Sequence, residues 1–233
     1  MQFFLLGDLR TDDPTYAAYG HSIKPEHIGD APRCPLCNQY VGMLAWLPPY
    51  NAEIVVHGRK LGDIIECSGN DLLVSAHFRD AWLTEGFRGI DVFSPLERLR
   101  IRPARLGRKP VTYFHVEPRL FGTQIDLARS LIEYDRPITC SKCRSGGIDS
   151  VRGFAIDEKS WTGEDLFFPW GMSGRLIVTD RVRQMRDKYG LTNMNLVPVE
   201  EVLIDPYRRW TPVDHSPDDP DEDLIPPDSS STN

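Results

Sequence analysis

The chain has 233 residues, a hydrophobic fraction of 40% and a formal net charge of −7. No run of about 18 apolar residues occurs, which argues against a membrane span, and the start MQFFLLGDLRTDD lacks the basic segment of a secretory signal. Four of the five cysteines lie in CxxC pairs, which favours a reducing compartment over a disulfide framework. We therefore expect a cytoplasmic protein without a membrane partner.

The negative charge is concentrated at the C-terminal end. Residues 211–233 contain six Asp, one Glu and no Lys or Arg, so they carry the whole −7, and residues 1–210 sum to zero. The same stretch contains five prolines. Such a segment cannot bury enough apolar surface to fold, so we predict a disordered acidic tail over 211–233.

In chain order, the first predicted element is a strand at QFFLLGDL, close to the N-terminus. The segment TYFHVEPRL, which begins at Thr112, resembles it at an offset of 110 residues. Each strand is followed by a CxxC pair: CPLC contains Cys34 and Cys37, and CSKC contains Cys140 and Cys143. The two pairs are 106 residues apart, which suggests an internal repeat.

Two predicted helices, near 75–85 and 179–189, strengthen the repeat. They share an N-cap hydroxyl, two apolar residues at helical spacing and a glycine that can end the helix in the left-handed conformation. These residues are Ser75, Phe78, Ala81 and Gly86 in the first helix, and Thr179, Val182, Met185 and Gly190 in the second.

A short alternating segment follows each glycine and predicts a strand. The segments are GIDVFSP, with Ile90 and Val92 on one face before Pro95, and NMNLVPVE, with Met194 and Leu196 on one face before Pro198. Each copy thus reads strand, loop, CxxC pair, middle strands, helix, strand. We predict an α+β fold of two similar tandem halves packed together, residues 1–105 and 106–210, joined by the basic connector IRPARLGRKP.

The four paired cysteines form a complete ligand set for tetrahedral Zn²⁺. If the halves pack face to face, the pairs can share one structural ion and close a long loop of the chain. This shared site is our preferred prediction, with these ligands: Cys34, Cys37, Cys140 and Cys143.

Three alternatives to a shared zinc stay open. Each pair could bind its own ion, although no histidine and no further cysteine between 116 and 214 could complete the second site. A redox dithiol would open a helix after a strand, a pattern that neither pair shows. The cysteines could also be reduced and free of metal. The fifth cysteine, Cys67, is expected to be an ordinary buried thiol.

The two CxxC pairs and the segment TDRVRQMRDKYGLTNMNLVPVEE resemble the double-CXXCG-motif proteins of myxobacteria, which are immunity proteins of toxin–immunity systems. The resemblance covers roughly residues 1–205. It departs from the motif where Asn38 and Arg144 replace the glycine after each pair. It implies a cytoplasmic, non-catalytic protein with structural zinc that binds and neutralises a cognate toxin.

Two other function classes stay open. The chain has no GxSxG, HExxH, P-loop or GxGxxG motif, and its six histidines are scattered, so we expect no enzyme, although an active site without a motif stays open. A zinc-ribbon-like nucleic-acid-binding protein is the second alternative, because a basic stretch over 98–109 could contact phosphates. The zero net charge of residues 1–210 argues against it, and the arginines could instead pair with acids of the body or the tail.

Two polar stretches, 11–30 and 157–174, are candidate toxin-binding loops. The second contains four aromatic residues among acids, which would suit a basic partner such as a nuclease toxin. The same aromatics could instead cover the core of the second half. They are Trp161, Phe167, Phe168 and Trp170.

Overall fold

The structure is a computed structural model and describes residues 1–7, 13–69, 71–108 and 110–207. The predicted tail, 211–233, lies outside these residues. The helices are α1 (Ala76–Glu85) and α2 (Asp180–Tyr189), with the short 3-10 helices η1 (Ala104–Gly107) and η2 (Val199–Glu201). The strands are β1 (Phe3–Leu6), β2 (Ala18–Ser22), β3 (Tyr50–Val56), β4 (Ile64–Glu66), β5 (Leu72–Ser75), β6 (Ser94–Arg102), β7 (Tyr113–Val116), β8 (Leu120–Gln124), β9 (Ile132–Tyr134), β10 (Ile148–Arg152), β11 (Leu166–Trp170), β12 (Ile177–Thr179), β13 (Leu196–Pro198) and β14 (Leu203–Ile204). The fold is therefore mixed α+β, as predicted.

The first sheet has six strands in the order β2, β3, β6, β7, β5, β4. Its two edges meet, because Gly20 on β2 and Cys67 just after β4 form a parallel bridge. A Cβ atom at residue 20 would lie 2.5 Å from the Cys67 Sγ, so only glycine allows this close approach. The sheet thus closes into a barrel around a small core that includes Ile54 and Leu73.

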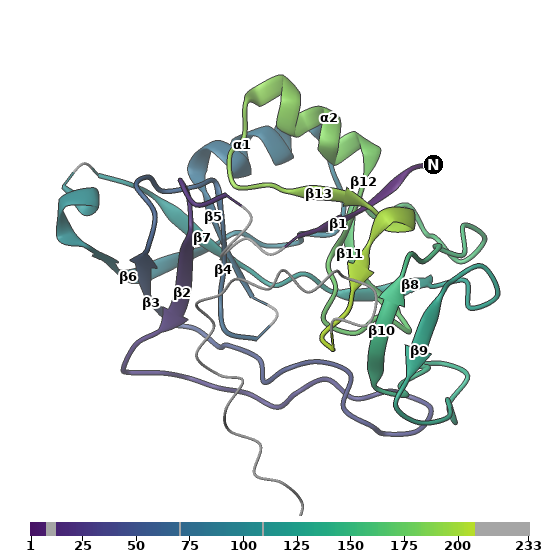
Figure 1. Cartoon of the computed structure of the whole chain (residues 1–233). Helices are drawn as coiled ribbons and strands as arrows, with labels where there is room; N and C mark the ends of the chain where they lie inside the picture. The colour runs from purple at the N-terminus through teal and green to yellow at the C-terminus, as the bar shows by residue number, and fades with distance from the viewer. Residues whose placement is uncertain (8–12, 70, 109, 208–233) are drawn as a thin grey trace, which may run out of the picture.

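The second sheet has the order β13, β1, β12, β11, β8, and a third sheet has the order β14, β10, β9. The second sheet repeats part of the first, because β6, β7, β5 and β4 lie in the same order as β13, β1, β12 and β11. In the second sheet the second of these positions is filled by β1, from the N-terminal end of the chain, whereas in the first sheet it is filled by β7, which follows β6 closely in the sequence. β1 pairs with β12 and β13, and β7 pairs with β5 and β6 (Figure 1).

The strand pairing crosses the predicted division of the chain at 105/106. The strand that opens each predicted half lies between two strands of the other half. The largest core likewise mixes residues from both sides of the division, for example Phe4 with Val178 and Phe78 with Val182. The boundaries of the halves stay a prediction, but residues on both sides of 105/106 contribute to the same sheets and to one core.

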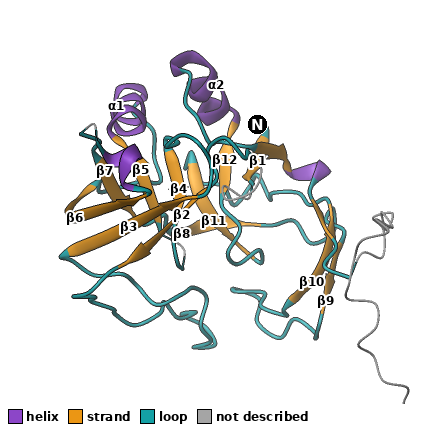
Figure 2. Cartoon of the chain, turned by 60° about the vertical axis from the view of Figure 1, so that its left-hand side comes forward, coloured by secondary structure: helices purple, strands orange, loops and turns teal. Residues whose placement is uncertain are grey.

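Both predicted helices are present and lie on the same side of the sheets (Figure 1 and Figure 2). They end as expected, with Gly86 and Gly190 both left-handed at φ 65°. The Ser75 hydroxyl accepts the N–H of Phe78 at 3.1 Å, as an N-cap should. Thr179 holds the N-cap position without this bond, and its hydroxyl donates to Asp165 at 2.9 Å.

The strands predicted directly after the two helices begin later than expected. β6 starts at Ser94 and β13 at Leu196, and Val92 is 61% exposed. The chain after α1 instead forms a loop whose Arg88 bonds through its backbone to Asp165. Gly89 has φ 121°, and a Cβ there would lie 2.0 Å from the carbonyl oxygen of Leu166. This close contact between backbones excludes a regular strand at that point.

Two buried aspartates connect the parts of the chain on either side of 105/106. Asp63 accepts the Ser75 hydroxyl at 2.5 Å, and both the backbone N–H and the hydroxyl of Thr192 at 2.8 Å. Asp165 accepts the Thr179 hydroxyl at 2.9 Å and the backbone N–H of Arg88 at 3.1 Å. Each carboxylate therefore binds the residue that caps one helix and the loop that follows the other.

Candidate metal centre

The CPLC pair lies at the tip of an irregular hairpin formed by residues 27–47, which we call the arm. Its two sides pair through bridges between Ile28 and Trp46 and between Arg33 and Tyr40. The side chain of Trp46 is buried in the barrel core and anchors the base of the arm. Figure 1 shows the arm running below the barrel toward the loop between β9 and β10, which contains CSKC.

The two CxxC turns have the same backbone conformation. The N–H of Asn38 donates to the Cys34 carbonyl at 2.9 Å, and the N–H of Arg144 donates to the Cys140 carbonyl at 3.0 Å. Asn38 and Arg144 are both left-handed, with φ 61° and 52°, at the positions where the CXXCG motif has glycine. The Arg144 side chain is held by a bond from its guanidinium to the carbonyl oxygen of Ile125 at 2.6 Å.

The two turns bring all four predicted ligands together. The four Sγ atoms lie within 4.8 Å of one another, with Cys34 to Cys140 at 3.8 Å and Cys37 to Cys143 at 3.6 Å. Four sulfurs held about 2.3 Å from one zinc in a tetrahedron are about 3.8 Å apart, so the spacing suits this ion. The cluster could bind a metal ion such as zinc, and it contains both pairs in one set.

Apolar side chains surround the inner side of the cluster. Val41 and Trp170 are buried against the cysteines, and Leu120 packs beside them. The Lys142 ammonium lies 5.0 Å from the centre of the Trp170 ring. Cys37 is the most exposed of the four cysteines, so the cluster opens to solvent on the arm side.

A comparison with known protein families finds no family that matches this chain, and a comparison with characterised proteins finds no similar sequence. The resemblance to the double-CXXCG-motif proteins therefore stays a prediction. Among the residues that the structure describes, no helix is both long enough and apolar enough to cross a membrane. The cytoplasmic localisation also stays a prediction.

The thiol pKa values differ within each pair. A bond from the backbone N–H of Cys143 is the main reason that the pKa of Cys140 is lowered to about 6, whereas burial raises the pKa of Cys143 to about 12. Burial also acts to raise the pKa of Cys34, but bonds from the backbone N–H groups of Cys37 and Leu36 outweigh it and lower that pKa. Four thiolates at this spacing would repel one another, so a bound cation would favour the fully deprotonated set.

The positions of the two helices and of Cys67 argue against a redox dithiol and against Cys67 as a fifth ligand. α1 begins at Ala76 and α2 at Asp180, so neither CxxC pair opens an α-helix as a redox dithiol does. Cys67 is 3% exposed in the barrel core, where burial raises the pKa of its thiol. It is therefore the buried thiol that the sequence indicated, and it is not part of the four-cysteine cluster.

The structure places the four aromatic residues of the candidate binding loop over 157–174. Phe167, Phe168 and Trp170 form β11 and are buried, and Trp161 packs with its ring 5.9 Å from that of Phe3. The aromatics therefore cover the core of this part of the molecule, which was the alternative reading. In the other candidate loop, 11–30, Thr11 and Asp12 lie outside the described residues, and Ala18–Ser22 is the barrel strand β2.

The basic stretch over 98–109 pairs in part with an acid of the body. Burial acts to raise the pKa of Glu53, but Arg102 and Arg100 outweigh it and hold the pKa below its ordinary value. The Arg100 guanidinium lies 3.4 Å from the Glu53 carboxylate. Lys109 lies outside the described residues. This pairing is the arrangement that the sequence offered as the alternative to phosphate binding.

Sequence reasoning missed the apolar surface of the arm. Six large apolar residues of the arm are 42–65% exposed, although apolar side chains usually avoid water when they gather in one place. The signal was present in the segment YVGMLAWLPPY, which is apolar without forming a helix or a long strand. The residues are Ile28, Leu36, Tyr40, Met43, Leu44 and Leu47.

Proposed function

We propose that this chain is a non-catalytic binding protein with one structural Zn²⁺, held by Cys34, Cys37, Cys140 and Cys143. The observation that carries the proposal is the single cluster of four sulfurs, drawn from turns 106 residues apart. Zinc at this point would fix the tip of the arm to the loop after β9. The ion would then stabilise the folded chain, since the unfolded chain has no preformed site.

We further propose that the chain consists of two similar halves that exchange their first strands. The repeated strand order, the two matching CxxC turns and the paired contacts of Asp63 and Asp165 support this arrangement. In an exchanged pair each half completes the sheet of the other, so the halves cannot separate without unfolding. Zinc would add a second connection on the side of the molecule where the arm lies.

The partner we propose is a cognate bacterial toxin, which the chain binds and neutralises as an immunity protein. The resemblance to the double-CXXCG-motif proteins is the main support. A scaffold fixed by metal and by strand exchange also suits an inhibitor, because a preorganised surface loses less entropy on binding. The exposed apolar arm is a surface that a partner could cover.

The test is whether the chain binds and neutralises the toxin region of a protein encoded beside it. We expect expression of that region alone to stop bacterial growth and co-expression of this chain to restore it, with a complex that survives size-exclusion chromatography. A double variant, Cys34→Ser with Cys140→Ser, should restore growth poorly. Absence of both a complex and growth rescue with the wild-type chain would contradict the proposal.

Salt dependence separates this function from the nucleic-acid alternative. Binding driven by phosphates weakens by orders of magnitude between about 50 and 200 mM salt, because counterions are released. We expect no such binding to DNA or RNA, and we expect a toxin complex that persists over this range.

A further inference from the structure

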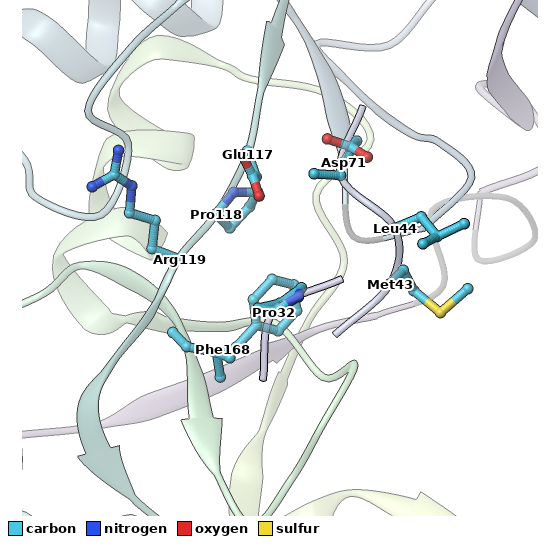
Figure 3. Close-up of a pocket in the computed structure, with 10 residues that line it drawn as sticks. Pro32, Met43, Leu44, Asp71, Glu117, Pro118, Arg119 and Phe168 are labelled. Carbon is cyan, nitrogen blue, oxygen red and sulfur yellow. The ribbon is translucent and has the colours of Figure 1, made fainter. Parts of the chain in front are cut away.

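A groove separates the arm from the body of the molecule. One part, of about 290 Å³, lies between Met43 and Leu44 of the arm and Asp71, Glu117 and Phe168 of the body (Figure 3). A second part, of about 210 Å³, also contains Met43, Leu44 and Asp71, and it continues toward the base of the arm. The two parts share these three residues, and we call them together the arm groove.

The arm side of the groove is apolar and exposed. Met43 is 59% exposed, Leu44 is 57% exposed, and Ile28 in the second part is 53% exposed. Figure 3 shows Met43 and Leu44 across from Glu117 and Pro118, with both side chains pointing away from these two residues in this view. A group of large apolar side chains in water around a concave surface is typical of a binding site.

The charged groups of the groove are mainly acidic. Glu117 is exposed and makes no ion pair with any residue in the described part of the chain, and Glu26 lines the second part. Asp71 reaches the groove while it binds the buried His115 ring at 2.6 Å. The one arginine of the lining, Arg119, is paired with Asp91 at 2.9 Å. The groove therefore presents carboxylates beside an apolar wall.

We propose that the arm groove binds a protein partner through a large apolar side chain next to a lysine or arginine. The apolar side chain would pack against Met43, Leu44 and Phe168, and the cation would lie against Glu117 and the rim of the groove. Nucleic acid does not fit this surface, since phosphates would face carboxylates. The proposal rests on the proposed function, because it names the surface that the toxin would contact and the chemistry of the contact.

The part of the arm that lines the groove lies between two anchor points, one of which is the turn that contains Cys34 and Cys37. The arm is anchored at its base by Trp46 and at its tip by the turn that contains Cys34 and Cys37. Leu120 lies both in the lining of the groove and against the cysteine cluster. Removal of the metal should therefore weaken partner binding, because the arm would lose the anchor at its tip. A substitution in the groove should weaken binding and leave the zinc in place.

Two substitutions test the groove in the full-length, zinc-loaded chain, with the toxin region of the adjacent gene as the probe. Leu44→Asp should weaken binding by about tenfold or more, and Glu117→Lys by about tenfold with a slower association. Matched controls are Leu131→Asp, at a leucine that is 61% exposed, and Glu201→Lys, at another exposed glutamate; both should bind within about twofold of wild type. Groove variants that keep their zinc and bind as tightly as wild type would overturn the proposal.

A second probe makes the result independent of the toxin. A phage-displayed library of random peptides, selected on the zinc-loaded chain, should yield sequences with a large apolar residue beside Lys or Arg, and these should not bind Leu44→Asp. Enrichment of acidic sequences, or no enrichment over the Leu44→Asp chain, would overturn the proposal that the arm groove binds such a partner. If the adjacent toxin region does not bind the wild-type chain but such peptides do, the immunity function is refuted and the binding role of the arm groove is supported.

Discussion

The CPLC and CSKC turns share one backbone conformation but differ in their surroundings. CPLC is at the tip of the arm, where Leu36 is 65% exposed and Cys37 is also exposed. Cys140 and Cys143 of CSKC are buried, and Arg144 beside them is bonded to the backbone of Ile125. The comparison indicates that the second pair belongs to the body of the molecule, whereas the first reaches it from the barrel. A metal at this point would fasten the tip of the arm to the loop that contains the second pair.

The two aspartates differ in a similar way. Asp63 and Asp165 each bind a helix cap and a distant loop, but Asp165 is completely buried and also pairs with Arg181 at 3.1 Å. Asp63 is 8% exposed and lies 3.3 Å from the His77 ring. Equivalent contacts can therefore contribute different amounts to stability, because burial raises the cost of leaving a polar group without a partner.

The largest expected effect comes from the cysteines, and it tests whether the two turns act as one site. Cys34→Ser and Cys140→Ser should each remove most of the zinc, since three thiolates and a weaker ligand hold it poorly. Each should lower the melting temperature by about 10 °C, the scale expected for loss of a cross-link across a loop of this length. The double variant should melt close to either single variant. Metal analysis and thermal denaturation measure these effects, and additive losses would indicate two separate sites.

A smaller effect is expected at the aspartates. Asp165→Ala should lower the free energy of unfolding by about 3 kcal/mol, because the Thr179 hydroxyl and the Arg88 N–H lose their buried acceptor. Asp63→Ala should cost about 2 kcal/mol, because water can reach its partners more easily. Urea denaturation measures both, with Asp80→Ala, an exposed helix residue, as the control. Equal costs at all three positions would refute the role assigned to the buried pair.

The smallest effect concerns the residue after each CxxC pair. Asn38→Gly should change the free energy of unfolding by less than about 0.5 kcal/mol, since asparagine and glycine both tolerate the left-handed conformation. Arg144→Gly relieves strain but removes the bond to Ile125, so we expect a net loss of about 1 kcal/mol. The same urea assay distinguishes them. A more stable Arg144→Gly protein would show that its side chain has no structural role.

Local signals predicted part of this fold well. A capping hydroxyl and a terminating glycine act on residues close to them in the chain. The helices therefore lie where Ser75, Gly86 and Gly190 predicted them. The cysteine cluster was predictable because no histidine could complete a separate site for the second pair. Both predictions depend on residue types with few structural options.

Long-range pairing could not be predicted in the same way. Nothing in FFLL, the sequence of β1, shows that it pairs with strands more than 170 residues later. The contact of Asp63 with Thr192 spans 129 residues, and neither residue type indicates it. The burial of Phe167 and Trp170 likewise follows from the position of β11 within its sheet, so the sequence left their role open.

X-ray absorption at the zinc edge, combined with metal analysis, shows whether one zinc is shared by both CxxC turns. We expect about one zinc per chain in protein purified without chelator, with four sulfur ligands at about 2.3 Å and no nitrogen or oxygen ligand. Two zinc ions per chain, a mixed ligand set, or folded protein with no metal would contradict it.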